Sequence, residues 1–280
     1  MSDLLGYQGK RVIVTGCFSG MGQAAAQLLL DLGAEVHGFD YKEATLPLAS
    51  FTNVDLRDPG SIEAGVSKLG GRVDALFNCA GLPNTFPAMD VMKVNFLGTR
   101  HLTEQLLPLM GEGSAIVSIS SNGGLGWSRN IPKNMEIIAT QGFQAGYDWC
   151  ERNSDTVGGG YAFSKENVIV WTQFMGVQLI KKGIRINCTL PGPTQTPMMG
   201  EFHQASGKGM VDAMVGPLGR YSTPAEQAGP LVLLNSDLAS VVNGVVLPVD
   251  GGFMGGVSTG QVDIGAMMAK AAAQQRAPAQ

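Results

Sequence analysis

Short runs of β-branched residues alternate with longer segments of helical period along most of the chain, and no other feature constrains the fold as much. Strands joined through helices build a parallel sheet, so we predict an α/β fold with one doubly wound sheet and helices on both faces. The predicted strands are Arg11–Thr15, Ala34–Phe39, Phe51–Val54, Val73–Asn78, Ala115–Ser120, Ile184–Leu190 and Gly244–Val249. The predicted helices are Gly20–Leu32, Pro59–Leu69, Met92–Met110, Tyr161–Lys181 and Pro224–Leu234.

Two segments interrupt this alternation, and neither is typical of a linker, so residues 1–280 are predicted to form a single domain. Residues 122–160 are too apolar for a disordered loop and are expected to form a helical insertion before the helix that starts at Tyr161. Residues 197–222 follow the sixth strand, where crevices in such sheets receive ligands, and are predicted to form a lid. The tail at 255–280 is predicted to be a frayed terminus, with a partner-contacting arm as the alternative.

Composition excludes several classes of function. Charged residues make up 15% of the chain and the formal net charge is −4, so the basic field that nucleic-acid binding needs is missing. No stretch approaches the roughly 18 uninterrupted apolar residues of a membrane span. The four cysteines and three histidines are scattered without a CxxC pair, which argues against a disulfide framework and a metal site. We therefore expect a cytoplasmic protein that acts on a small molecule.

The first predicted strand runs into the turn TGCFSGMG, residues 15–22, which leads directly into a helix. Glycines in such a turn allow close approach of a pyrophosphate, whose charge would lie at the helix N-terminus. The spacing differs from the GxGxxG fingerprint of the Rossmann-type site, and alone it is equally compatible with a plain connection. If the turn binds a dinucleotide, the expected contacts are Gly16, Ser19, Gly20, Met21 and Gly22.

Acidic and small residues follow at the ends of the next predicted strands. Asp40 stands where a ribose-binding acid is expected, and a carboxylate there would repel a 2′-phosphate, so NAD is predicted rather than NADP. Lys42 is the one nearby cation that argues otherwise. Asp55, with Leu56, is predicted at the adenine edge, and a helix-capping role for Asp55 is the alternative. Close backbone approach at the fourth strand end adds Asn78, Ala80 and Gly81, although turn chemistry alone explains them.

The sequence YAFSK begins a long predicted helix. A separation of four places the phenol of Tyr161 and the ammonium of Lys165 on one helical face, and a neighbouring cation favours the phenolate. Moving a tyrosine pKa from about 10 to near 7 requires about 4 kcal/mol of differential stabilisation. Tyr161 is therefore predicted to act as a general acid/base with a pKa lowered by Lys165. Taken alone, the Tyr-x-x-x-Lys spacing is common on solvated helical faces.

The order of these motifs resembles the short-chain dehydrogenase/reductase family over about residues 10–253. The resemblance rests on the glycine turn, an Asn-x-Ala-Gly strand end, a helix Asn, a strand-end Ser, YxxxK and a Pro-Gly motif. It implies that Asn95 holds a water in a proton relay, that Ser121 hydrogen-bonds the reacting oxygen and that Lys165 also binds the nicotinamide ribose. Ser120 is the adjacent rival of Ser121 but fits the Ser-x-x-Gly register less well. Cofactor contacts are also implied at Tyr161, Lys165, Pro191, Thr194 and Thr196.

Two departures from the family pattern stand out. Cys79 replaces the usual second Asn of Asn-Asn-Ala-Gly, and the 40 positions from Ser121 to Tyr161 form a much longer gap than in most members. This insertion, with ENVIVWTQ at residues 166–173 and RINCTLPGP at residues 185–193, resembles the branch that contains 3α-hydroxysteroid dehydrogenase/carbonyl reductase and coniferyl-alcohol dehydrogenase.

These features predict an oxidoreductase that transfers hydride between NAD(H) and a secondary or aromatic alcohol or carbonyl. A catalytically idle NAD-binding redox sensor or scaffold is the alternative function. The substrate is expected to be apolar and cyclic, like a steroid, terpenoid or phenylpropanoid, because the lid carries Met198, Met199, Phe202, Met210 and Met214. The insertion carries aromatic side chains that either line the same pocket or belong to the core or a subunit contact, namely Trp127, Phe143 and Trp149. The resemblance also implies a homodimer or homotetramer.

Overall fold

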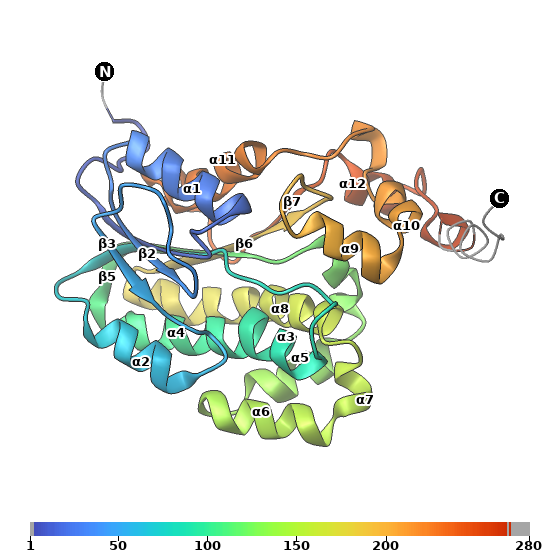
Figure 1. The fold of residues 1–280 in the computed structure, drawn as a ribbon, viewed down its shortest axis with the longest axis horizontal. Helices are drawn as coiled ribbons and strands as arrows, with labels where there is room; N and C mark the ends of the chain where they lie inside the picture. Colours follow the sequence, from blue (N-terminus) through green and yellow to red (C-terminus); the bar gives the residue numbers. More distant parts are fainter. Residues whose placement is uncertain (1–2, 268, 270–280) are drawn as a thin grey trace.

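The computed structural model describes residues 3–267 and 269, and its centre is one seven-stranded sheet (Figure 1). The strand order is β3-β2-β1-β4-β5-β6-β7, and each neighbouring pair is parallel. The order reverses between β1 and β4, and ligands bind at this kind of switch point in open α/β sheets. The strands are β1 (Arg11–Thr15), β2 (Glu35–Asp40), β3 (Ser50–Asn53), β4 (Val73–Asn78), β5 (Met110–Ile119), β6 (Arg185–Pro191) and β7 (Val246–Val249).

Helices cover both faces of the sheet, which confirms the predicted fold class (Figure 1). On one face lie α1 (Gly20–Asp31) and α11 (Pro224–Asn235), which contact each other. On the other face lie α2 (Pro59–Ser67), α4 (Thr99–Leu106) and α8 (Tyr161–Leu179). The sheet separates two hydrophobic cores, one for each layer of helices.

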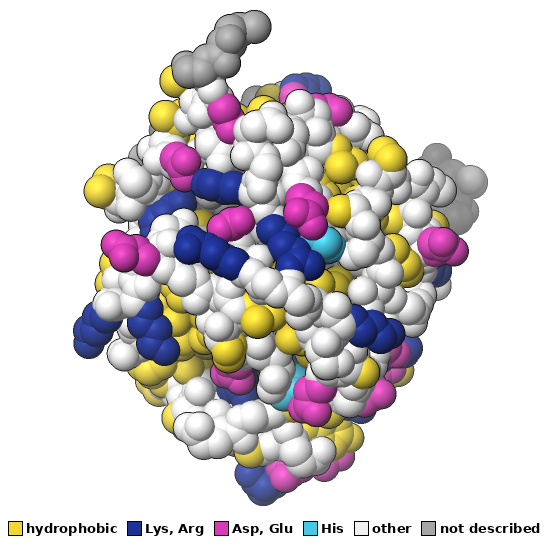
Figure 2. Space-filling model, turned by 90° about the vertical axis from the view of Figure 1, so that its left-hand side faces the viewer, with side chains coloured by type: hydrophobic (Ala, Val, Ile, Leu, Met, Phe, Trp, Pro, Cys, Tyr) yellow, Lys and Arg dark blue, Asp and Glu magenta, His cyan; other side chains and the backbone are white. Residues whose placement is uncertain are grey.

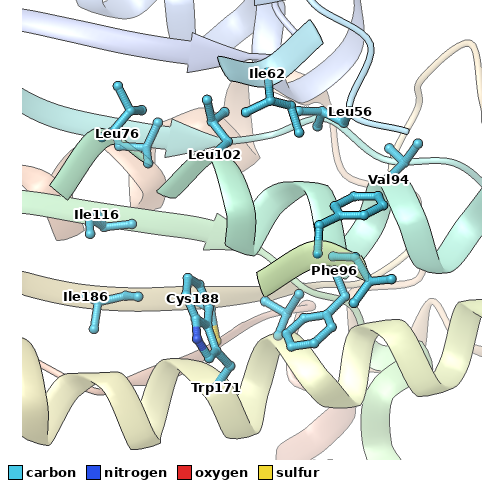
Figure 3. Packing of buried hydrophobic residues seen from close by; sticks show 14 of the residues in the cluster. Leu56, Ile62, Leu76, Val94, Phe96, Leu102, Ile116, Trp171, Ile186 and Cys188 are labelled. Carbon is cyan, nitrogen blue, oxygen red and sulfur yellow. The ribbon is translucent and has the colours of Figure 1, made fainter. Parts of the chain in front are cut away.

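The core on the α8 side determines where α8 lies. Figure 3 shows Trp171 of α8 directed toward β6, close to Cys188 and Phe96. The rings of Phe96 and Trp171 meet edge to face, with centroids 6.4 Å apart. Truncating a buried aromatic side chain of this kind costs about 3–5 kcal/mol. Because α8 begins at Tyr161, this packing also holds the residues of the YAFSK motif in place.

The helix predicted over residues 92–110 consists of several segments. They are α3 (Ala88–Met92), a π-helical turn η1 (Lys93–Gly98), α4 and a 3-10 turn η2 (Leu107–Leu109). The prediction was wrong at its end because Met110 already pairs with Val73 of β4, so β5 starts five residues earlier than expected. A π-helical turn within a helix often marks a functional site, and this one carries Asn95.

The insertion before α8 is helical, as predicted. It contains η3 (Asn122–Ser128), α5 (Ile131–Ile138), α6 (Gly142–Arg152) and α7 (Ser154–Val157), which pack on α8, on each other and on η1. Arg100 of α4 is 1% exposed and holds the insertion in place by donating to the carbonyl oxygens of Ile137 (3.2 Å) and Gly142 (2.7 Å). The ring of Trp149 stacks on Phe163 at 5.8 Å.

The lid segment is also helical, with α9 (Met199–Ser206), α10 (Lys208–Ala213) and a 3-10 turn η5 (Gly216–Leu218). Two further 3-10 turns are η4 (Ile180–Lys182) and η6 (Asp237–Ala239). The tail predicted as frayed from residue 255 starts inside α12 (Phe253–Ser258), so that prediction is wrong for its first residues. Residues 268 and 270–280 of the tail lie outside the described part of the chain.

The surface shows mixed charge on the face drawn in Figure 2. Lysine and arginine side chains lie there among aspartates and glutamates, without a continuous basic patch on that face. Within residues 3–267 and 269, no helix is both long and apolar enough to cross a bilayer.

Candidate active site

A cavity of about 380 Å³ lies at the carboxyl ends of the central strands. One part of its wall is the glycine turn after β1, and another part is the lid with α9 and α10. The segments that follow β4, β5 and β6 form the wall between them. The cavity therefore lies at the switch point where the strand order reverses.

The glycine turn packs too closely for side chains at two positions. A Cβ added to Gly22 would lie 2.2 Å from the carbonyl oxygen of Gly16. A Cβ added to Gly16, where φ is +69°, would lie 2.7 Å from the amide nitrogen of Ala80. The side chain of Ser19 makes no capping hydrogen bond to α1, whose first residues line the cavity. Uncapped amides at a helix N-terminus favour an anion, so this wall fits the diphosphate of a dinucleotide.

Asp40 lines the cavity at the end of β2. Its carboxylate accepts hydrogen bonds from the backbone amides of Phe18 (3.0 Å) and Lys42 (3.1 Å), which orient it at the edge of the glycine turn. The ammonium of Lys42 lies over two aromatic rings, 5.4 Å from the centroid of Phe18 and 5.2 Å from that of Tyr41. Lys42, the cation that would favour NADP, therefore already makes cation–π contacts.

Asp55 also lines the cavity, and it forms a two-pronged ion pair with Arg57. The guanidinium of Arg57 lowers the pKa of the Asp55 carboxyl. Asp58, not Asp55, caps α2 by accepting from the amide of Gly60. The alternative capping role considered for Asp55 is therefore wrong.

The end of β4 contributes backbone to the cavity wall but not the side chain of its asparagine. Ala80, Gly81 and Leu56 line the cavity, whereas Asn78 does not. The amide of Asn78 is buried and donates to the hydroxyls of Thr103 (3.1 Å) and Ser118 (3.2 Å), joining β4 to α4 and β5. The position of Asn78 therefore corrects its predicted cofactor contact to a structural role.

Two adjacent serines at the end of β5 have different partners. The hydroxyl of Ser120 donates to the backbone carbonyl of Lys165 at 2.7 Å. Ser121 accepts from the amide of Gly123 at 2.9 Å, and it acts on the pKa of the Tyr161 phenol in the lowering direction. Of the two serines, Ser121 is the one that acts on the pKa of Tyr161, and its predicted role in binding the reacting oxygen stays a prediction.

Tyr161 and Lys165 lie on the same face of α8, at the cavity wall. The ammonium of Lys165 is 5.7 Å from the ring centroid of Tyr161 and donates to the backbone carbonyl of Ile119 at 2.9 Å. The Phe202 ring of the lid meets the Tyr161 ring edge to face, with centroids 5.2 Å apart. Ser121, Tyr161 and Lys165 thus line the same cavity as the glycine turn.

Comparison with known proteins agrees with this arrangement. Residues 10–132 match the model described as short chain dehydrogenase, and residues 145–254 match the one described as Enoyl-(Acyl carrier protein) reductase. The chain is 33% identical to the coniferyl-alcohol dehydrogenase of a Pseudomonas species over 87% of its own length and 96% of that protein. The chain belongs to the short-chain dehydrogenase family. It is an oxidoreductase that acts on alcohols.

Two solved structures of this family extend the comparison. The 3-alpha-hydroxysteroid dehydrogenase from Pseudomonas sp. B-0831 complexed with NADH is 28% identical, with a TM-score of 0.75, and the match covers 91% of this chain and all of that one. A structure from Beutenbergia cavernae with bound NADP, described as a putative NAD(P) dependent gluconate 5-dehydrogenase, is 25% identical, with a TM-score of 0.69, over 90% and 99% of the two chains. The resemblance to the branch with 3α-hydroxysteroid and coniferyl-alcohol dehydrogenases is thereby confirmed.

The pKa of Tyr161 corrects one expectation for this dehydrogenase. Burial raises the pKa of Tyr161 to about 12, and Ser121 acts in the lowering direction. Burial also lowers the pKa of Lys165 to about 8. The protein alone therefore does not make Tyr161 acidic, because the loss of hydration outweighs the lowering effect of Ser121.

Asn95 lies behind the cavity wall in the π-helical turn. Its Oδ1 accepts from the backbone amide of Leu82 at 2.7 Å, and its Nδ2 donates to the carbonyl of the same residue at 3.0 Å and to Ser164 at 3.3 Å. The side chain thus positions the segment after β4, and its predicted role in holding a water stays a prediction.

The loop after β6 closes the cavity near the lid. Pro191, Thr194 and Thr196 all line the cavity. Thr194 donates to the carbonyl of Gly192 and shares a hydrogen bond with Ser222, both at 2.9 Å. The lid side chains predicted to face the substrate also line it: Met198, Met199, Phe202, Met210 and Met214. Of the insertion, only Asn122 and Gly123 do, so Trp127, Phe143 and Trp149 belong to the packing around the core.

Several cavity residues escaped sequence reasoning. Arg57 stands two positions after Asp55, a spacing that carried no signal until the fold paired the two. Phe18 lies between the glycines of the turn, where the motif specifies no residue type. Asn122 and Gly123 directly follow Ser121 and could have been found only from that adjacency. Among the described residues, no group of three or more His, Cys, Asp or Glu is placed to hold a metal.

Proposed function

We propose that this dehydrogenase transfers a hydride between NAD(H) and the alcohol or carbonyl carbon of an apolar cyclic substrate. The observation that carries the proposal is one cavity that Ser121 and Tyr161 line together with the glycine turn and Asp40. A reacting alcohol oxygen placed between the two hydroxyls would be positioned by one and exchange its proton with the other.

The chain's own residues account for the proton and for orientation. NAD, when bound, supplies the acceptor for the hydride. In oxidation, Tyr161 takes the proton of the alcohol; in reduction, it returns a proton to the carbonyl oxygen. Lys165 is placed to bind the nicotinamide ribose and, as an ammonium, to favour the phenolate. Burial raises the pKa of Tyr161 to about 12. The positive charge of the oxidised cofactor is expected to lower this pKa when NAD is bound.

NAD is proposed as the cofactor in preference to NADP. Asp40 places a carboxylate at the cavity edge where the adenosine ribose is expected, and it would repel a 2′-phosphate. Arg57 could offset this repulsion, but Asp55 already binds it in a two-pronged ion pair. Comparing kcat/KM for the two cofactors with one alcohol tests the choice, and a preference for NADP would overturn it.

An apolar cyclic alcohol is proposed because the lid side of the cavity is lined by methionine and phenylalanine side chains. Relatives named for coniferyl alcohol and for 3-alpha-hydroxysteroids support a ring-bearing substrate. No observation favours an idle redox sensor, since Ser121, Tyr161 and Lys165 are all present at the cavity.

The function can be tested by following NADH absorbance with steroids, terpenols, cyclohexanols and aromatic alcohols. We expect turnover of at least one ring-bearing alcohol and a loss of about 10²–10⁴-fold in kcat for Tyr161→Phe, with NAD affinity retained. Tyr147→Phe, on α6 and outside the cavity, serves as the matched control and should keep its kcat. Tight NAD binding without turnover of any alcohol would refute the proposed dehydrogenase activity and favour the idle NAD-binding redox sensor.

We also propose a homodimer or homotetramer in the cytoplasm. The family membership supports self-association, and sedimentation equilibrium would measure the mass. The four cysteines are all free thiols, which suits a reducing compartment.

A further inference from the structure

The residue that follows Lys165 on α8 carries a buried carboxylate bound to the insertion. Glu166 is 5% exposed. Its Oε1 accepts from Nδ2 of Asn130 at 3.2 Å, and its Oε2 accepts from the same nitrogen at 2.9 Å and from Nδ2 of Asn134 at 3.4 Å. Burying a carboxylate is costly unless hydrogen bonds replace its lost hydration, so these contacts hold the insertion and α8 together.

The segment from Ser120 to Asn130 is attached to α8 at both ends. At its start, the hydroxyl of Ser120 donates to the backbone carbonyl of Lys165 at 2.7 Å. At its end, the amide of Asn130 donates to the carboxylate of Glu166. Two consecutive residues of α8 thus hold the two ends of a segment that contains Ser121 and η3.

Between these two attachments, η3 packs on α8 through glycines. A Cβ added to Gly123 would lie 2.9 Å from Cε1 of Tyr161. A Cβ added to Gly126 would lie 2.4 Å from Oε1 of Glu166. The backbone of η3 therefore lies directly against the phenol ring near its start and against the carboxylate near its end.

We propose that Glu166 is a positioning residue that fixes η3 on α8 and thereby fixes Ser121 relative to Tyr161. The inference rests on the proposed function, in which a substrate oxygen lies between these two hydroxyls. Glu166 does not line the cavity, so it acts through η3 and not on the substrate. Without the carboxylate, one end of the segment loses its attachment and η3 can move away from the phenol ring. A displacement of about 1 Å near reacting groups can lower a rate by about 10²-fold.

Steady-state kinetics of Glu166→Ala tests the proposal, with NAD and the ring-bearing alcohol that the wild type oxidises best. We expect kcat to fall at least about tenfold while the dissociation constant for NAD stays within about threefold, because the segment that moves is not the glycine turn after β1. Glu166→Gln should restore most of kcat, since a single carbonyl oxygen can accept from both asparagine amides.

A matched control loosens the insertion elsewhere. Thr140 lies between α5 and α6 and accepts from both terminal nitrogens of Arg100, at 3.3 and 3.4 Å. Thr140→Val removes this contact with α4 and leaves the attachment at Glu166 in place, so kcat should not change. An equal loss of kcat in Thr140→Val or in Glu166→Gln would overturn the proposal, because the loss would then not depend on this attachment.

A second variant covers the case in which Glu166→Ala does not fold. Asn130 is exposed, so Asn130→Ala removes the same attachment without opening the core. It should lower kcat in the same direction, again with NAD affinity retained. An unchanged kcat in a folded Glu166→Ala would overturn the proposal, as would an unchanged kcat in Asn130→Ala where Glu166→Ala does not fold.

Hydrogen exchange separates this inference from the function on which it rests, because it needs no turnover. The amides of Gly124, Arg129 and Asn130 donate to carbonyl oxygens within the segment, at 3.0, 2.9 and 3.1 Å. In Glu166→Ala, amide exchange of residues 121–130 should become at least about tenfold faster, whereas Glu166→Gln and Thr140→Val should exchange like the wild type.

The two measurements together distinguish the possible failures. If exchange becomes faster in Glu166→Ala but the wild type oxidises no alcohol, the proposed function fails while the attachment of η3 by Glu166 stands. If the wild type oxidises alcohols and Glu166→Ala keeps its kcat, the positioning role fails and the function stands. A fall in kcat without faster exchange in residues 121–130 would also overturn the positioning role, because η3 would then have stayed in place.

Discussion

Replacing Lys165 by methionine should abolish activity and leave the folded protein as stable as before or more so. The ammonium is 5% exposed, and burial lowers the pKa of Lys165 from 10.5 to about 8. Since each tenfold change in an acid constant corresponds to about 1.4 kcal/mol, the charge destabilises the fold by about 3 kcal/mol. Methionine removes this cost but leaves the Ile119 carbonyl without its donor, at about 1–3 kcal/mol. The net change at neutral pH is therefore a gain of about 0–2 kcal/mol.

The pH dependence of the free energy of unfolding reports the contribution of Lys165 more specifically than a measurement at one pH. Above pH 8 the folded wild type releases the proton of Lys165, whereas the unfolded chain holds it up to about pH 10.5. The unfolded state then binds more protons, so wild-type stability rises with pH in this window. The methionine variant lacks this term, and the advantage of Lys165→Met over wild type should fall by about 3 kcal/mol between pH 8 and 10.5. Burial raises the pKa of Tyr161 to about 12, so in the folded protein the phenol stays largely protonated up to pH 10.5 and contributes little to this difference.

Urea denaturation from pH 6 to pH 10.5, with linear extrapolation to water, measures this difference. Lys133→Met is the matched control, because its side chain is 46% exposed on α5, and its effect should stay within about 0.5 kcal/mol. If the difference in free energy of unfolding between wild type and Lys165→Met does not vary with pH, the idea that burial destabilises the charged form of Lys165 is refuted. Retained dehydrogenase activity in Lys165→Met would refute its place at the reacting centre.

Three further changes test other parts of the site. Asp40→Asn removes the charge at the ribose end and should lower the preference for NAD over NADP in kcat/KM by at least about tenfold, and an unchanged ratio would contradict the role of the carboxylate. Gly123→Ala would place a Cβ 2.9 Å from the Tyr161 ring, so kcat should fall at least about tenfold at unchanged NAD affinity, both measurable by steady-state kinetics and titration. Because the pKa of Tyr161 is raised, kcat/KM for alcohol oxidation should climb with pH by up to tenfold per unit from pH 6 to 9, and a flat profile would exclude the phenol as the base.

The sequence by itself determined the architecture, because the signals involved are local. Alternating strand and helix periods predicted the parallel sheet, and most bounds hold to within about two residues. The spacing of the glycine turn specifies a backbone shape, which requires Gly22. The spacing of the YAFSK motif specifies a shared helical face, which places Tyr161 beside Lys165. The start of β5 at Met110 was missed because its pairing with Val73 is a tertiary contact.

Only the tertiary structure decided which side chains are free to react. Ser120 and Ser121 are neighbours in sequence, but the path of α8 brings the carbonyl of Lys165 to one and the phenol of Tyr161 to the other. The Nδ2 of Asn78 donates to Thr103 of α4 and Ser118 of β5 and does not line the cavity, whereas Asn122 lines the cavity wall with both amide atoms unpaired. The pKa of Tyr161 rises instead of falling because hydration is lost on burial, and burial depends on chain segments far apart in sequence.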